Sequence, residues 1–314
     1  MSDTLNDELF AAPAWAAVLE RAYGMNVQTS AGGVPFVELD DLAGHRILAL
    51  PFSDHLPIED INAYLAFQSE VATRYPGLPL EVRTRIPFNA VGDLQDVRVK
   101  EYVLHQYTAG GQMSSTHAWG VRKARRVGIR VEPSTTTAAR ERFLALYHRQ
   151  RMHKFNSIPQ PARFFEAVHD QFMEAGNGYY LEAYTAENQH AATLVILVQN
   201  RGLYYKFAAS NPEYLSQKPN NLLLATLSDQ VDEGQYDFLD FGRSGASEAY
   251  AGLRGFKERT GAQPSSITYL SSGPKLDNTR FRALLGNLTN SLVEHQASRE
   301  VVAAVSNDIY RFFT

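Results

Sequence analysis

The sequence predicts a mixed α+β protein built from two domains. The chain has 314 residues, about twice the length of a typical domain. Hydrophobic residues make up 44% of the chain and charged residues 20%, which is ordinary for a globular protein and excludes wholesale disorder. From about residue 127 onward, strand patterns alternate with helix patterns, which favours a twisted mixed sheet flanked by helices.

The first 110 residues combine helix and strand patterns. Pro13–Tyr23 carries apolar residues at helical spacing, and Gly24 follows as a stop signal. A second helix is predicted over Pro57–Arg74, because its apolar spacing ends at Pro76. Alternating runs predict strands at Pro35–Leu39, Arg46–Leu50, Leu80–Ile86 and Val97–Tyr107.

A stretch rich in glycine and serine, Ala109–Ser115, predicts a linker between the two domains. A basic segment follows it, which contains Arg122, Lys123, Arg125, Arg126 and Arg130. Its two interpretations are a solvated face and an electrostatic rail for tRNA or an anionic glycan. We therefore place the domains at residues 1–110 and 111–275, with a helical extension over 276–314.

The second half is predicted to run strand, helix, helix, three strands, helix, strand, helix, strand. Strands are expected at Val127–Val131, Tyr179–Tyr184, Ala191–Gln199, Leu203–Ala209, Tyr236–Phe241 and Ile267–Ser271. Helices are expected within Pro133–Lys154, Pro161–Ala175, Asn220–Glu233, Ser247–Thr260 and Asp277–Phe313. A meander that changes to crossover connections contains a place where adjacent strands splay, and the splayed ends form a ligand cleft.

Composition and missing motifs exclude several classes of protein. Without cysteine, the chain has no disulfide, no Cys-ligated metal and no thiol nucleophile. The net charge of −4 and the pI of about 6.1 argue against a general nucleic-acid binder. The nine histidines lack ligand spacing, so no metal site is predicted. No secretory leader or membrane helix is recognised, which predicts a soluble cytoplasmic protein without membrane insertion.

Several short segments carry a family resemblance. LPFSDH (Leu50–His55), NNLLL (Asn220–Leu224), DFGRS (Asp240–Ser244) and GLRGFKERTGA (Gly252–Ala262) resemble the FemAB-like, CelD/BioF-type branch of the GNAT acyltransferases. The resemblance covers about residues 10–275. It implies two GNAT-like domains in tandem and the transfer of an acyl group from an activated donor to an amine, in cell-envelope or exopolysaccharide metabolism.

The resemblance implies acyl-CoA or aminoacyl-tRNA as the donor, with acyl-CoA preferred, and one segment departs from the acyl-CoA pattern. The GNAT loop that holds the CoA pyrophosphate is rich in glycine, whereas Ser216–Leu222 (SQKPNNL) contains none. Two alternatives therefore stand beside an acyl-CoA-dependent enzyme. One is an aminoacyl-tRNA-dependent Fem-type transferase, and the other is a non-catalytic, GNAT-shaped scaffold.

Three residues are the catalytic candidates. The resemblance makes Lys257 the lysine that stabilises developing negative charge in Fem enzymes, and a solvated helix lysine is the alternative. Asp240 follows an apolar strand, where it would accept a proton, orient Arg243, or simply cap the turn. His55 is a proton-transfer candidate in LPFSDH, and the alternative there is a plain turn.

The binding candidates are mainly cations and amides. Past the end of a strand, Arg243 suits a phosphate or carboxylate as a bidentate donor. The donor-binding set is completed by the predicted helix start at Lys218, Asn220 and Asn221. The resemblance places Arg149 and Arg151 in the segment where Fem enzymes contact an anionic acceptor, and Asp54 of LPFSDH completes the acceptor-binding set. For the two arginines, the alternative is a favourable interaction with the dipole at a helix C-terminus.

Overall fold

The computed structural model describes residues 8–92 and 94–313, and it divides into two compact units. Unit 1 holds the chain up to Tyr102 together with Asn156–Ala167 and Ser266–Thr314. Unit 2 holds Val103–Phe155 and Val168–Ser265. The boundary expected near residue 110 thus falls inside unit 2, and the helical extension after residue 275 belongs to unit 1.

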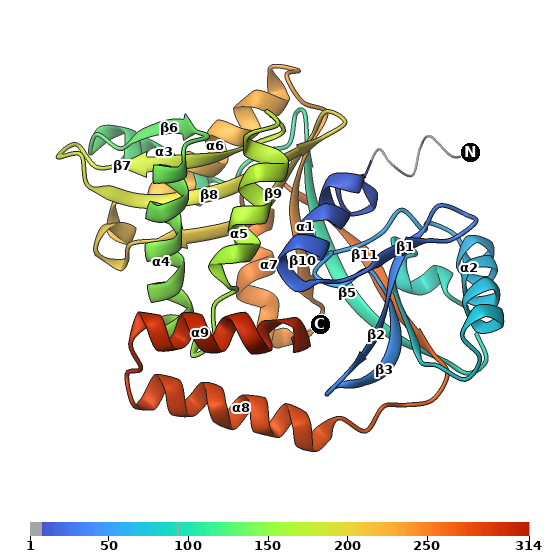
Figure 1. Cartoon of the computed structure of the whole chain (residues 1–314). Coiled ribbons are helices and arrows are strands. Elements are labelled where there is room, and N and C mark those ends of the chain that lie inside the picture. Colours follow the sequence, from blue (N-terminus) through green and yellow to red (C-terminus); the bar gives the residue numbers. More distant parts are fainter. Residues whose placement is uncertain (1–7, 93, 314) are drawn as a thin grey trace. The chain divides into compact units, whose positions relative to one another are not determined.

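Unit 1 is a mixed sheet with helices around it (Figure 1). Its strands lie in the order β1 (Val27–Thr29), β2 (Pro35–Asp41), β3 (Gly44–Ala49), β4 (Leu80–Arg83), β11 (Gln263–Ser272) and the first half of β5 (Val97–Thr108). β3 and β4 run parallel, whereas β4 and β11 pair antiparallel. Its helices are α1 (Pro13–Tyr23), α2 (Ile61–Arg74), α8 (Thr279–Glu294) and α9 (Arg299–Ile309).

Local signals in the sequence explain where these helices begin and end. Gly24 adopts the left-handed conformation that terminates α1. The carboxylate of Asp60 accepts a hydrogen bond from the Ala63 amide and caps α2, so this helix begins later than the predicted Pro57. α1 buries Trp15, which packs edge-on against Phe164 within unit 1.

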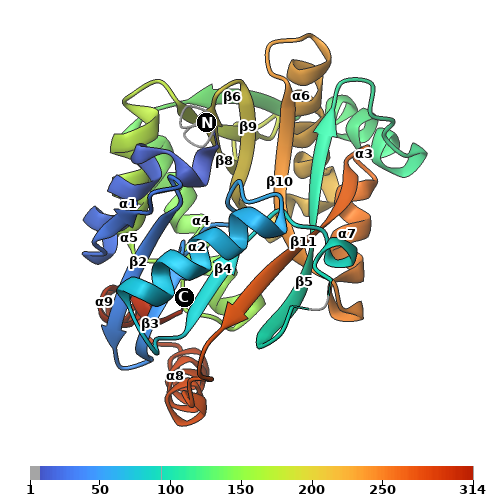
Figure 2. The same ribbon diagram turned by 90° about the vertical axis from the view of Figure 1, so that its right-hand side faces the viewer.

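Unit 2 has a sheet covered by helices on both faces (Figures 1 and 2). From the second half of β5 its strands follow the order β10 (Phe238–Gly245), β9 (Gly202–Ser210), β8 (His190–Gln199), β7 (Gly178–Tyr184) and β6 (Arg130–Ser134). α4 (Thr137–Phe155) lies on one face, and the other face carries α3 (Ser115–Arg126), α6 (Pro219–Asp232) and α7 (Ala251–Glu258). α5 (Ala162–Val168), which belongs to unit 1 up to Ala167, continues into a π-helical turn at His169–Met173 in unit 2.

The mixed fold class is confirmed, and several boundaries differ from the prediction. β6 begins at Arg130 rather than Val127, and α4 begins at Thr137 rather than Pro133. The basic segment was not predicted as a helix, yet the structure forms α3 there. Ser114 Oγ caps α3 by accepting from the His117 amide at 3.2 Å. The buried face of α3 consists of His117, Gly120, Val121 and Ala124, so it shows little apolar periodicity among the surrounding cations.

Two absences concern the described residues only. None of the helices in residues 8–92 and 94–313 is long and apolar enough to span a bilayer. The same part of the chain contains no group of three or more His, Asp or Glu side chains placed to hold a metal ion.

Candidate functional site

Two neighbouring strands of unit 2 separate halfway along their length. β9 and β10 run parallel and pair through Phe238 with Gly202, Leu239 with Leu203, and Asp240 with Tyr204. The pairing of the two strands ends at Asp240 and Tyr204, although β10 continues to Gly245 and β9 to Ser210. The predicted splay point therefore lies directly after Asp240, at the carboxyl ends of two parallel strands.

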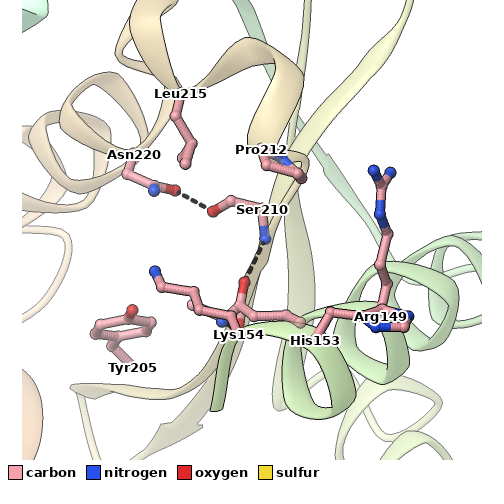
Figure 3. Close-up of a pocket in the computed structure, with 10 residues that line it drawn as sticks. Arg149, His153, Lys154, Tyr205, Ser210, Pro212, Leu215 and Asn220 are labelled. Atoms are coloured by element: carbon pink, nitrogen blue, oxygen red, sulfur yellow. Dashed lines mark hydrogen bonds between the residues drawn. The ribbon is translucent and has the colours of Figure 1, made fainter. Parts of the chain in front are cut away.

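A pocket of about 820 Å³ lies along β9 past this point, which is within the usual size range of ligand sites (Figure 3). α4, β9 and the start of α6 form its walls. Its lining residues are Arg149, Gln150, His153, Lys154, Tyr205, Ala208, Ser210, Pro212, Leu215 and Asn220.

The α4 wall of the pocket is cationic. Arg149, His153 and Lys154 all come from the last two turns of α4, and Lys154 lies 5.2 Å from the centre of the Phe155 ring. Arg149 makes only a long, exposed ion pair with Glu213 at 3.6 Å. Because no acidic side chain lines this pocket, it favours an anionic ligand.

Hydrogen bonds tie the three walls together. Gln150 of α4 accepts from the Ser210 amide at 3.0 Å and donates to the Ala208 carbonyl at 3.4 Å. Its side-chain amide therefore binds backbone groups near the end of β9. Ser210 Oγ donates in turn to Asn220 Oδ1 at 3.0 Å, which links β9 to the first turn of α6. Figure 3 marks the two bonds of Ser210, one to Asn220 and one to the side chain from α4, beside the pocket.

A buried polar network lies along the middle of β10, so Asp240 and Arg243 belong to the strand and do not follow it as predicted. Asp240 accepts from the Gly242 amide at 2.6 Å and from Gln106 Nε2 at 3.0 Å. Lys257 of α7 is 4% exposed, and its ammonium donates to the Gly242 carbonyl at 2.7 Å and to the Arg243 carbonyl at 3.4 Å. The catalytic candidates Asp240 and Lys257 thus share the Gly242 peptide segment.

His105 of β5 extends this network. Its ring is fully buried, and its Nε2 lies 3.4 Å from Glu258 Oε1. Burial lowers the pKa of His105, and the positive charge of Lys257 lowers that pKa further. His105 is therefore close enough to Lys257 for the charge of the lysine to act on it, and its hydrogen-bond partner is the half-exposed Glu258.

The donor-binding candidates point in different directions. Asn220 lines the pocket, whereas the Asn221 amide group donates to His117 Nδ1 at 3.1 Å and packs against α3. Lys218 directly precedes α6 and lies over the ring of Trp119. Arg243 is partly buried and joins the polar network through its carbonyl.

The other candidates are separated between the units. Arg149 lines the pocket, and the partly buried Arg151 lies 5.8 Å from the centre of the Phe155 ring. His55 and Asp54 belong to unit 1. There, His55 is fully buried and accepts from Arg85 Nε at 3.2 Å, and the Asp54 carbonyl accepts from Tyr269.

Sequence reasoning missed the residues that organise the site, namely Gln106, His105, Gln150, Ser210 and His117. None belongs to a recognisable motif, because each acts through contacts with residues far away in the chain. The one relevant sequence signal was the alternation along the predicted strand Val97–Tyr107. Side chains of successive strand residues point to opposite faces of a sheet, so Gln106 and His105 are expected on opposite faces.

The contact between α3 and α6 requires a glycine. A Cβ at Gly120 would lie 2.7 Å from Cγ and Nδ2 of Asn221, closer than side chains tolerate. We expect Gly120→Ala to lower the free energy of unfolding by about 1–3 kcal/mol, as overpacking does. Urea unfolding measures this. Gly252→Ala on α7 is the control, because the Cβ added by this substitution would meet no neighbouring atom within 4 Å. Equal stability of the two variants would contradict a tight contact.

Acid should destabilise the protein through two buried histidines and one partly buried histidine. Burial lowers the pKa of His105, His117 and His190 from 6.5, so the unfolded chain binds protons at these sites before the native chain does. Stability is therefore complete above the unfolded pKa and is lost as the pH falls below it. We expect the urea midpoint to drop between about pH 7 and about pH 5. His190→Gln should make the drop shallower, and an unchanged slope would contradict the assignment.

Comparison with known proteins identifies part of the chain. Residues 115–257 match the family model of the acetyltransferase (GNAT) domain. This range contains every residue that lines the pocket, together with Asp240 and Lys257. No curated protein matches the chain.

Solved structures share the fold at low sequence identity. The chain is similar to FemX at 14% identity with a TM-score of 0.63, over 91% of this chain and 97% of FemX. It is similar to L-PGS from Bacillus licheniformis at 10% identity and a TM-score of 0.57, over 88% and 92% of the two chains. A conserved protein of unknown function from Bacteroides thetaiotaomicron matches at 12% identity and a TM-score of 0.56, over 87% and 93%. At these identities the likeness concerns the fold alone.

Proposed function

Since residues 115–257 form a GNAT-type acetyltransferase domain in a chain of FemAB-like fold, we propose that the protein transfers an acyl or aminoacyl group to an amine. The observation that carries this proposal is the cationic pocket beside the diverging ends of β9 and β10. It lies inside the GNAT domain, and the buried Asp240–Lys257 network lies along the middle of β10 in the same unit.

The proposed reaction is a direct transfer. The nitrogen of the acceptor amine attacks the carbonyl carbon of the donor, and a C–N bond forms as the C–S or C–O bond to the leaving group breaks. The amine loses a proton, and the leaving thiolate or alkoxide gains one. The chain has no cysteine, so we assign no Cys-linked enzyme intermediate to the reaction.

Two groups of residues divide the work in this proposal. Lys257 places a positive charge where the oxyanion of the tetrahedral intermediate develops, and Asp240 fixes the Gly242 segment against which Lys257 is held. Arg149 and Lys154 bind an anionic part of a substrate in the pocket. The alignment of both substrates supplies the remainder of the rate enhancement.

The donor is proposed to be acyl-CoA, with aminoacyl-tRNA as the alternative. The start of α6 supports aminoacyl-tRNA as the alternative donor. Lys218 and Pro219 occupy positions where glycine would let the pyrophosphate of coenzyme A approach the backbone closely. A CelD/BioF-type role in the cell envelope and a cytoplasmic location belong to the same proposal. In the alternative without catalysis, the protein is a GNAT-shaped scaffold.

The test is a transfer assay on the full chain. Mass spectrometry of ligands retained by the purified protein first selects a donor, and the product amide is then measured with acyl-CoA and with aminoacyl-tRNA. We expect Arg149→Gln with Lys154→Gln to raise KM for the anionic substrate about tenfold or more. Arg130→Gln on β6, an exposed side chain bonded to Asn188, is the matched control. If neither donor yields product and the purified protein retains no ligand, the result supports the non-catalytic scaffold.

A further inference from the structure

An exposed tryptophan stands beside the start of α6 in unit 2. The chain has two tryptophans: Trp15 is fully buried, whereas Trp119 on α3 is 47% exposed. Large aromatic side chains left in solvent are often binding surfaces for flat ligands. Trp119 is not part of the pocket lining and has no role in the mechanism above.

Two lysines lie over the ring of Trp119. Nζ of Lys123, one turn further along α3, is 5.4 Å from the ring centre, and Nζ of Lys218 is 5.9 Å from it. Neither ammonium has a carboxylate within 4.0 Å in the part of the chain that the structure describes. An aromatic face with two uncompensated ammonium groups combines base stacking with phosphate binding.

The backbone at Lys218 supports a role for its side chain. Lys218 has a φ of +66°, a left-handed conformation that favours glycine or asparagine over lysine. Residues held in such conformations concentrate at ligand clamps and active sites. Here the conformation places the lysine between the ring of Trp119 and the first turn of α6.

The packing of α3 on α6 holds this surface next to the pocket. The bond from Asn221 to His117 and the close approach at Gly120 join the two helices. Asn220, which lines the pocket, is only two residues beyond Lys218. The backbone therefore connects the lysine over Trp119 to the wall of the pocket across two residues.

We propose that Trp119, Lys123 and Lys218 form a platform on which the base of an adenosine nucleotide stacks while the lysines hold its phosphates. This rests on the proposed function, because both candidate donors carry such a nucleotide: coenzyme A contains it, and aminoacyl-tRNA ends in it. The platform binds the nucleotide end of the donor, and the pocket takes the acyl or aminoacyl end.

Intrinsic fluorescence tests the platform directly. Because Trp15 is buried, a stacked base should quench only the emission of Trp119. AMP, coenzyme A and a short RNA ending in CCA are titrated into the full chain, and the tighter of the last two identifies the donor class. We expect saturable quenching that disappears in Trp119→Ala, and calorimetry should show a dissociation constant raised about tenfold or more. Trp119→Phe should retain most of the affinity.

Charge variants complete the test. Lys123→Gln with Lys218→Gln should weaken binding and flatten its salt dependence, whereas Lys100→Gln, which removes a lysine near Tyr102 in unit 1, should do neither. The proposal is overturned if no nucleotide binds, or if Trp119→Ala binds as the native protein does. Transfer with an unchanged donor KM in Trp119→Ala would remove the platform and leave the proposed function standing. Nucleotide binding without any transfer would support the platform and contradict the proposed function.

Discussion

Lys257→Met is expected to reduce kcat for acyl transfer by about 10² to 10³-fold, the usual effect of removing one group that stabilises an oxyanion. The ammonium of Lys257 is buried against the carbonyls of Gly242 and Arg243, so its charge is poorly screened by solvent. Methionine preserves most of the packing and removes the charge. Single-turnover kinetics with saturating donor separates this effect from a loss of binding.

The same substitution also has a structural cost. Without Lys257, the Gly242 carbonyl loses its hydrogen-bond donor, and we expect a loss of about 1–3 kcal/mol in the free energy of unfolding. Lys257→Arg keeps a positive charge and should recover part of kcat. Glu258→Gln is the neighbouring control, because its side chain is half exposed and contacts His105 only at 3.4 Å. A folded Lys257→Met protein with kcat within about a factor of two of the native value would refute the catalytic assignment.

Arg142→Met is expected to lower the free energy of unfolding by about 3 kcal/mol. Arg142 of α4 donates through Nε and a terminal nitrogen to both carboxylate oxygens of Glu182 on β7, at 2.8 and 2.7 Å. Glu182 is only 2% exposed, so the substitution leaves a buried carboxylate without its main partner. Urea denaturation measures the loss.

A second partner gives this prediction a pH signature. His190 Nε2 lies 3.6 Å from Glu182, and the positive charge of Arg142 helps to lower the pKa of His190. Removing Arg142 should therefore raise that pKa, and a protonated His190 should partly replace the arginine in acid. We expect the difference between variant and native stability to shrink as the pH falls through about 6. The double variant Arg142→Met with Glu182→Gln should recover stability, and additive losses would contradict the pairing.

The sequence was sufficient where local chemistry determines local structure. Helical spacing followed by Gly24 predicted α1, and the proline at the first position of α6 predicted its start. The runs of the second half that were predicted as strands correspond to β7, β8 and β9. The FemAB-like GNAT resemblance is supported by the family match over residues 115–257 and by the fold shared with FemX.

The site depended on contacts that a sequence does not show. The motif around Lys257 indicated a special residue, but its partners on β10 are about fifteen residues away and are reached only when α7 folds back. NNLLL suggested two equivalent asparagines, and the structure separates them, since Asn220 lines the pocket and Asn221 bonds to His117. A helix rotates each successive residue by about 100°, so neighbouring side chains face different surroundings.

The sequence by itself thus determined the mixed fold class, most helices and strands, and the absence of cysteine chemistry, because these follow from local periodicity and composition. Only the tertiary structure decided that Gln150 binds the end of β9, that Trp119 is exposed beside two lysines, and that His55 is buried against Arg85. These arrangements depend on the directions in which strands diverge and helices pack, which are set by contacts between residues far apart in the chain.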